Sequence, residues 1–195
     1  MDFASFNHMK NSIYLFFLVP LILSILAYQG YGFIFKAGVT LSCILILLVG
    51  SKTSLKIVND IWFILGAFTF SIIGDWFLSN KGESFVMFAA GIGFYFLAHA
   101  GYLIYAIKNG SLNKTFTLFI LAIYLLFFAN VLWPAINDTI LLVSVLLYLL
   151  ISCFSVGASY NLYFSPVVRW SYFTGVVLIL LSDTRLLYTS PSPRD

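Results

Sequence analysis

Residues Phe116–Leu132 have the sequence FTLFILAIYLLFFANVL, a run of 17 residues without a charged side chain. A helix needs about 20 mostly apolar residues to cross a bilayer, and about 17 are enough at the lower limit. The run does not alternate polar and apolar residues, as a strand of a membrane barrel does, so it favours a helix. This stretch therefore indicates the kind of element from which the fold is built.

The composition of the whole chain agrees with this interpretation. Of its 195 residues, 62% are hydrophobic and 9% are charged, and the mean hydropathy is +1.02. Soluble domains carry about 25% charged residues, so this chain has too few charges to cover a surface in water. Lipid must act as its solvent, and its backbone groups must be satisfied within helices. The sequence predicts an all-α polytopic transmembrane helix bundle.

The chain contains about seven such runs, separated by turns too short to form an extramembrane domain. The first run is short unless it takes in flanking residues. We expect a single transmembrane helical domain over residues 11–184. Its predicted spans are Ile13–Tyr28, Phe33–Gly50, Ile61–Leu78, Phe85–Ile107, Thr115–Leu132, Thr139–Tyr160 and Trp170–Leu187.

The distribution of Lys and Arg between the turns predicts the orientation. The N-terminal segment and the even-numbered turns hold six basic residues, whereas the odd-numbered turns hold only Lys81. Because basic residues are retained on the cytoplasmic side, we expect a multi-pass protein of a bacterial inner (plasma) membrane with its N-terminus in the cytoplasm. The six are Lys10, Lys52, Lys56, Lys108, Lys114 and Arg169.

Residues 185–195 are expected to be a non-native tail. The decapeptide Leu186–Asp195, LLYTSPSPRD, matches residue for residue the translation of a transposase-type sequencing adapter. Such a segment is kept out of fold reasoning. A disordered polar tail is the alternative. On the first interpretation the native sequence ends near Asp183 or Thr184, so the seventh helix is incomplete.

Charge and cysteine usage exclude several classes of function. The formal net charge is +3, and the basic residues form no patch, so we expect no nucleic-acid partner. The two cysteines, Cys43 and Cys153, lie in apolar runs without metal-ligand spacing, so we expect neither a disulfide nor a metal centre.

Four ionisable residues lie inside predicted spans, where each costs a few kcal/mol and marks a candidate functional site. They are Lys36, Asp75, His99 and Asp183. At 1.5 Å per residue, Lys36, Asp75 and Asp183 share one depth towards the outer side, and His99 lies deeper. Simpler roles are possible for three of them: Lys36 as an interfacial anchor, Asp75 as a partner of the following turn, and His99 as a structural hydrogen bonder.

Polar residues also form stripes at helical spacing. Gly91, Tyr95, His99 and Tyr102 share one face, and Lys36, Thr40 and Cys43 share another. We expect these stripes to line one wet cavity, although serines in membrane helices also serve packing. A third stripe comprises Ser144, Tyr148, Ser152, Ser155 and Ser159.

These residues resemble the lysoplasmalogenase (YhhN-like) family of membrane proteins. The resemblance covers nearly the whole chain before the tail, and the order and spacing of the matching segments carry it. The family usually has eight helices, so one would be absent here, and Ala37 stands where the family has proline. The matching segments are Phe35-Lys36 with Thr40, Gly74-Asp75, Phe94 through Ala98-His99 with Tyr102, and Ser182-Asp183.

The resemblance implies hydrolysis of the vinyl ether bond of lysoplasmalogens, a lysophospholipid substrate taken from the bilayer. Asp75 and Asp183 would be the catalytic pair, one donating a proton and one acting as carboxylate, as in glycosidases. Lys36 would bind the phosphate, and His99, Tyr102 and Tyr148 would contact the substrate or orient the pair. No cofactor or metal is implied. A small transporter or lipid-binding protein using the same cavity is the alternative, and a purely structural protein leaves the aspartates unexplained.

Overall fold

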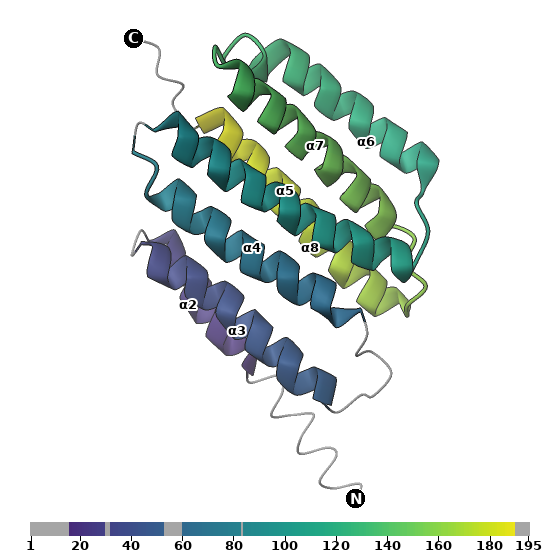
Figure 1. Cartoon of the computed structure of the whole chain (residues 1–195). Helices are drawn as coiled ribbons and strands as arrows, with labels where there is room; N and C mark the ends of the chain where they lie inside the picture. The colour runs from purple at the N-terminus through teal and green to yellow at the C-terminus, as the bar shows by residue number, and fades with distance from the viewer. Residues whose placement is uncertain (1–15, 30–31, 53–59, 83, 190–195) are drawn as a thin grey trace, which may run out of the picture.

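The computed structural model describes residues 16–29, 32–52, 60–82 and 84–189, and within these it is helical without strands. The helices lie side by side and roughly parallel to one another (Figure 1). They are α2 (Leu18–Tyr28), α3 (Phe33–Lys52), α4 (Ile61–Ser79), α5 (Phe85–Lys108), α6 (Lys114–Phe127) with its π-helical continuation η1 (Phe128–Leu132), α7 (Thr139–Ser159) and α8 (Pro166–Thr189).

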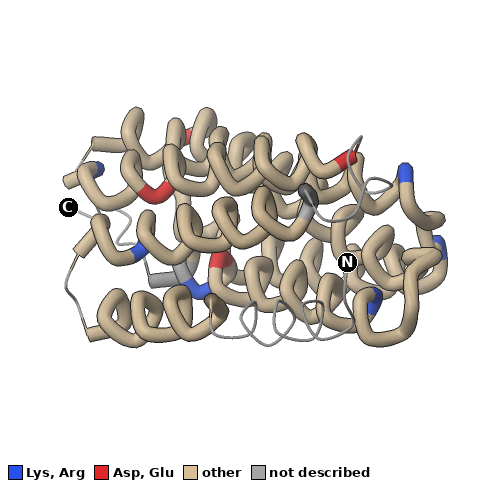
Figure 2. The backbone as a smooth tube through the Cα atoms, turned by 90° about the horizontal axis from the view of Figure 1, so that it is seen from below, with Lys and Arg blue, Asp and Glu red and all other residues tan. Residues whose placement is uncertain are grey.

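Among the described residues, six helices are long and apolar enough to cross a membrane, α3 to α8, with η1 counted as part of the α6 span. Their outer faces carry large exposed apolar side chains such as Ile34, Val86 and Ile140. Most Lys and Arg of the described part lie nearer the two ends of the bundle than its centre (Figure 2). This is the surface of a protein with lipid around its middle, so the predicted all-α membrane bundle is confirmed.

The predicted bounds differ from the observed ones mainly at two helices. Described helix α2 has 11 residues, too few to cross a bilayer alone, and residues 13–15 of the predicted first span lie outside the described part. Helix α8 begins at Pro166 rather than Trp170, because proline suits the first turn of a helix, where no N–H donor is needed. Helix α8 continues to Thr189. A helical conformation there does not test the expectation that residues 185–195 are a non-native tail.

Side-chain caps begin three of the helices. The Ser84 hydroxyl accepts from the backbone N–H of Met87, and Asn113 Oδ1 accepts from that of Phe116 at 3.0 Å. Asp138 Oδ1 accepts from the N–H of Leu141 at 2.7 Å and begins α7. Each cap satisfies a backbone donor that has no partner within the helix. The caps therefore account for the close agreement between predicted and observed starts of these helices.

Small residues bring α4 and α5 close together. A Cβ atom on Gly74 would lie 3.2 Å from the carbonyl oxygen of Gly91, and one on Gly101 would lie 2.7 Å from the carbonyl oxygen of Phe63. In a membrane, where lipid is as apolar as leucine, such close backbone approach is a main source of helix association. This close α4–α5 contact positions the first half of the site described next.

Candidate functional site

The first half of the site is a hydrogen bond between α4 and α5. Asp75 follows Gly74, and Tyr95 lies one turn after Gly91, so the glycine contact brings the two side chains together. The Tyr95 hydroxyl donates to Asp75 Oδ1 at 2.6 Å. Asp75 is partly buried, and a carboxyl group at this depth needs such a donor to compensate for lost hydration.

The second half joins α5, α7 and α8. The Tyr148 hydroxyl of α7 donates a short hydrogen bond to Asp183 Oδ2 of α8. His99 Nε2 of α5 lies 3.3 Å from the Tyr148 oxygen and 3.7 Å from Asp183 Oδ2. His99 is fully buried, and Tyr148 and Asp183 are nearly so. Three helices thus contribute one polar side chain each to a cluster enclosed by apolar residues.

A small cavity lies between the two halves. Tyr95 of the first half and Tyr148 and Asp183 of the second half line it, together with Ile92 and Leu187. Asp75 does not line this cavity itself but is bonded to Tyr95, which does, so the two aspartates are linked through one site.

The remaining predicted residues lie at the edge of this site. Lys36 is exposed near the start of α3. Tyr102 follows His99 on α5 with its ring edge-on to the imidazole at a centroid distance of 5.9 Å. The described residues contain no group of three His, Cys, Asp or Glu side chains placed to hold a metal ion.

Tyr95 is the site residue that sequence reasoning did not assign. It belongs to the Gly91–Tyr102 stripe, four residues before His99, so it was visible only as a polar member of a helical face. Its bond to Asp75 depends on how α4 and α5 are placed along one another, which no spacing within one helix indicates.

Of the two roles that the sequence left open for the α7 serine stripe, a wet cavity lining and helix packing, the described structure agrees with packing. Ser152, Ser155 and Ser159 are fully buried, and none of them lines the cavity between the aspartates. Ser152 donates to the carbonyl of Tyr148, and Ser159 to that of Val156, both on their own helix. Serine hydroxyls in helices commonly bond back in this way, so this face serves packing, and Tyr148 is its one member at the site.

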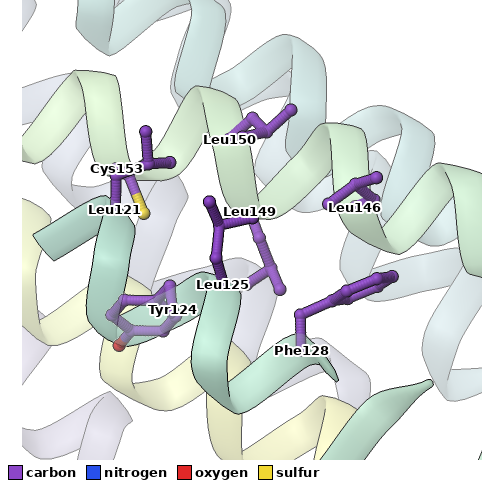
Figure 3. Close-up of a pocket in the computed structure, with 8 residues that line it drawn as sticks. All are labelled: Leu121, Tyr124, Leu125, Phe128, Leu146, Leu149, Leu150 and Cys153. Atoms are coloured by element: carbon purple, nitrogen blue, oxygen red, sulfur yellow. The ribbon is translucent and has the colours of Figure 1, made fainter. Parts of the chain in front are cut away.

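A second depression, between α6 and α7, has different chemistry (Figure 3). Six of its eight lining side chains are hydrocarbon, and the Tyr124 hydroxyl points away from the leucines. That hydroxyl accepts from Thr184 of α8 at 3.2 Å. The depression therefore presents mainly apolar surface, without a carboxyl or imidazole group. It is lined by Leu121, Tyr124, Leu125, Phe128, Leu146, Leu149, Leu150 and Cys153.

Fold and site together define a multi-pass integral membrane protein with a pair of tyrosine-bonded aspartates inside its helix bundle. The sequence matches the YhhN family over residues 32–190, most of the chain and all of the site. The chain belongs to the YhhN family, as the sequence predicts. Neither the curated proteins nor the solved structures contain a significant match.

Proposed function

We propose that this protein hydrolyses the vinyl ether bond of lysoplasmalogens, with Asp75 and Asp183 as the reacting carboxyl groups. The observation that supports the proposal is a pair of membrane-embedded aspartates, from α4 and α8, each bonded to a tyrosine that lines one small cavity. Buried carboxyl groups in a membrane are costly and are retained mainly for function. Membership of the YhhN family agrees with a lysoplasmalogenase-like protein.

Vinyl ether hydrolysis needs two carboxyl groups in opposite states. One aspartic acid donates its proton to the outer vinyl carbon, and the ether carbon becomes an oxocarbenium ion. Water adds to that carbon and gives a proton to the other aspartate, and the addition forms a hemiacetal. The hemiacetal hydroxyl then returns a proton to the first aspartate, while the glycerol oxygen leaves with the proton of the second. The products are a fatty aldehyde and a glycerophospho-headgroup, and both aspartates regain their initial states.

The other residues fit supporting roles in this proposal. Lys36 is exposed near the start of α3, where it can contact a headgroup phosphate as a point charge. His99 and Tyr102 lie beyond the aspartates on α5, where they can order the pair or the ether oxygen. A lysolipid entering from the surrounding bilayer would bring its ether bond to the depth of the aspartates.

The test is release of fatty aldehyde from a lysoplasmalogen by the purified protein in lipid vesicles. Asp75→Asn and Asp183→Asn should each lower turnover by about 100-fold or more, since asparagine can neither donate a proton to carbon nor carry the charge. Their double variant should be little worse than either single one, because members of one catalytic unit are not additive.

Asp60→Asn is the matched control, because Asp60 lies at the start of α4 in an exposed ion pair with Lys108 at 3.1 Å. It should keep full activity. Turnover like that of the unmodified protein in both Asp75→Asn and Asp183→Asn would remove the catalytic assignment and favour transport or lipid binding through the same cavity.

A further inference from the structure

Each aspartate of the site is held by a tyrosine through one carboxyl oxygen. Tyr95 donates to Oδ1 of Asp75, and Tyr148 donates to Oδ2 of Asp183. Both tyrosines also line the cavity between the two halves. A carboxyl group rotates easily about its last bond, so a fixed donor on one oxygen sets the direction of the other. The site thus contains two matched tyrosine–aspartate pairs.

His99 extends the second pair into a chain of three. Its Nδ1 atom is buried without a hydrogen-bond partner among the described residues. A buried unpaired N–H is rarer than a buried unpaired acceptor, so in the neutral ring we assign the hydrogen to Nε2. Nε2–H then points to the Tyr148 oxygen at 3.3 Å, and the Tyr148 hydrogen points to Asp183. This order fixes the direction in which the Tyr148 hydroxyl donates.

We propose that Tyr95 and Tyr148 are positioning residues that hold Asp75 and Asp183 with one oxygen bonded and the other available to the substrate, and that His99 sets the direction of the Tyr148 hydroxyl. This inference rests on the proposed function for its effect on turnover. The pairing itself does not, and it can be measured without any reaction. Two pairs are needed because the proposed chemistry requires both carboxyl groups to face the same ether bond.

The kinetic test uses Tyr95→Phe and Tyr148→Phe, which keep the ring and remove only the hydroxyl. Each should lower kcat by about 10- to 100-fold, the range that a hydrogen bond to a charged group is worth. KM should change by less than about twofold, because these tyrosines act on the reacting carboxyl groups rather than on the headgroup.

The matched control is Tyr172→Phe, since the Tyr172 hydroxyl also joins α8 to α5, by donating to the carbonyl of Tyr102 at 2.9 Å. It should leave kcat unchanged. A loss of turnover in Tyr172→Phe equal to that in the other two variants would mean that turnover depends on any hydrogen bond between these helices. That result would overturn the positioning role.

His99 is tested by two substitutions with opposite expected results. His99→Leu should lower kcat as much as Tyr148→Phe, and combining the two should add little, because both break the same chain. His99→Gln should recover most of the activity, since its amide N–H can take the place of Nε2–H. Equal losses in His99→Leu and His99→Gln would contradict the assigned direction.

The second readout is labelling by an apolar carbodiimide such as dicyclohexylcarbodiimide, which modifies protonated carboxyl groups, with mass spectrometry to locate the modified aspartate. A donated hydrogen bond favours the ionised form and occupies one oxygen. Tyr95→Phe should therefore speed labelling of Asp75 alone, Tyr148→Phe should speed labelling of Asp183 alone, and Tyr172→Phe should change neither.

The two readouts separate the two proposals. Paired changes in labelling support the pairing even if the protein releases no aldehyde, in which case only the proposed function fails. Labelling that stays constant, or that rises at both aspartates in every variant, overturns the pairing, while loss of hydrolysis in the asparagine variants would still support the proposed function.

Discussion

The close contact between α4 and α5 gives a quantitative test of the fold that supports the site. In Gly101→Ala the new Cβ atom would lie 2.7 Å from the carbonyl oxygen of Phe63 and 3.0 Å from the Cβ atom of Ala67. Carbon–oxygen contacts between packed helices are normally about 3.3–3.6 Å. The two helices must therefore separate locally by about 0.6–0.9 Å, because the obstructing carbonyl belongs to the backbone and cannot turn away.

The cost of this separation can be isolated with Gly93→Ala. Gly93 lies on the same helix α5, and the Cβ atom that alanine adds there would meet no neighbouring atom within 4 Å. Alanine improves helix propensity over glycine by about 0.8–1.0 kcal/mol at either position, so the difference between the variants leaves only the contact term. Overpacking of a tight contact typically costs about 1–3 kcal/mol. Gly101→Ala should therefore be less stable than Gly93→Ala by about 1–3 kcal/mol.

The measurement is the midpoint of unfolding by SDS in mixed micelles, followed by far-UV circular dichroism for both variants and the unmodified protein. Gly93→Ala should unfold at the same or a higher SDS fraction than the unmodified protein. Equal midpoints for Gly101→Ala and Gly93→Ala would refute the close approach of α4 and α5, and with it the reason given for the Asp75–Tyr95 hydrogen bond.

Two further predictions concern the ends of the bundle. Lys36→Met should raise KM for a lysoplasmalogen by about tenfold with a smaller change in kcat, because a headgroup phosphate is bound in both ground and transition states. Lys114→Met, an exposed lysine at the start of α6, should change neither, and equal effects of both variants would remove the phosphate role of Lys36. The Lys/Arg distribution predicts a cytoplasmic position for the turn after α5, so a cysteine introduced at Asn109 should resist an impermeant maleimide in intact cells and react after lysis.

The membrane spans could be predicted because the surrounding lipid determines their structure. An apolar run such as Phe116–Leu132 has few ways to form its backbone hydrogen bonds in lipid, so both the presence of a membrane span and its helical structure follow from composition. The π-helical turn at Phe128–Leu132 could not be predicted, since it depends on packing rather than on composition. Its residues Phe128 and Leu132 pack in the same buried cluster as Tyr148 and Leu187. The turn thus helps to form the apolar wall around the site.

The sequence singles out the two aspartates and Tyr148 as candidate site residues but not Tyr95, for a related reason. A carboxyl group in an apolar span stands out in the sequence. Tyr95, in contrast, is one of 12 tyrosines in this chain, and nothing in the sequence identifies it as the partner of Asp75. Tyr95 becomes a site residue only through the contact of Gly74 with Gly91, which sets the positions of two helices along each other. The serine stripe shows the opposite limit: a polar face on a helix is visible in sequence, but the Ser152 and Ser159 hydroxyls bond to their own backbone.

The choice of tyrosine as partner agrees with the chemistry proposed for the aspartates. A lysine or arginine in contact with a carboxyl group offers only donors, so it favours the ionised state and opposes the protonated one. A tyrosine hydroxyl can donate to a carboxylate and accept from a carboxylic acid, so Tyr95 can keep its hydrogen bond to Asp75 in both states. An aspartate that must release a proton to carbon and later regain it changes state twice in each turnover. A neutral partner that serves both states holds it in place throughout, which a fixed charge at the same position would not do.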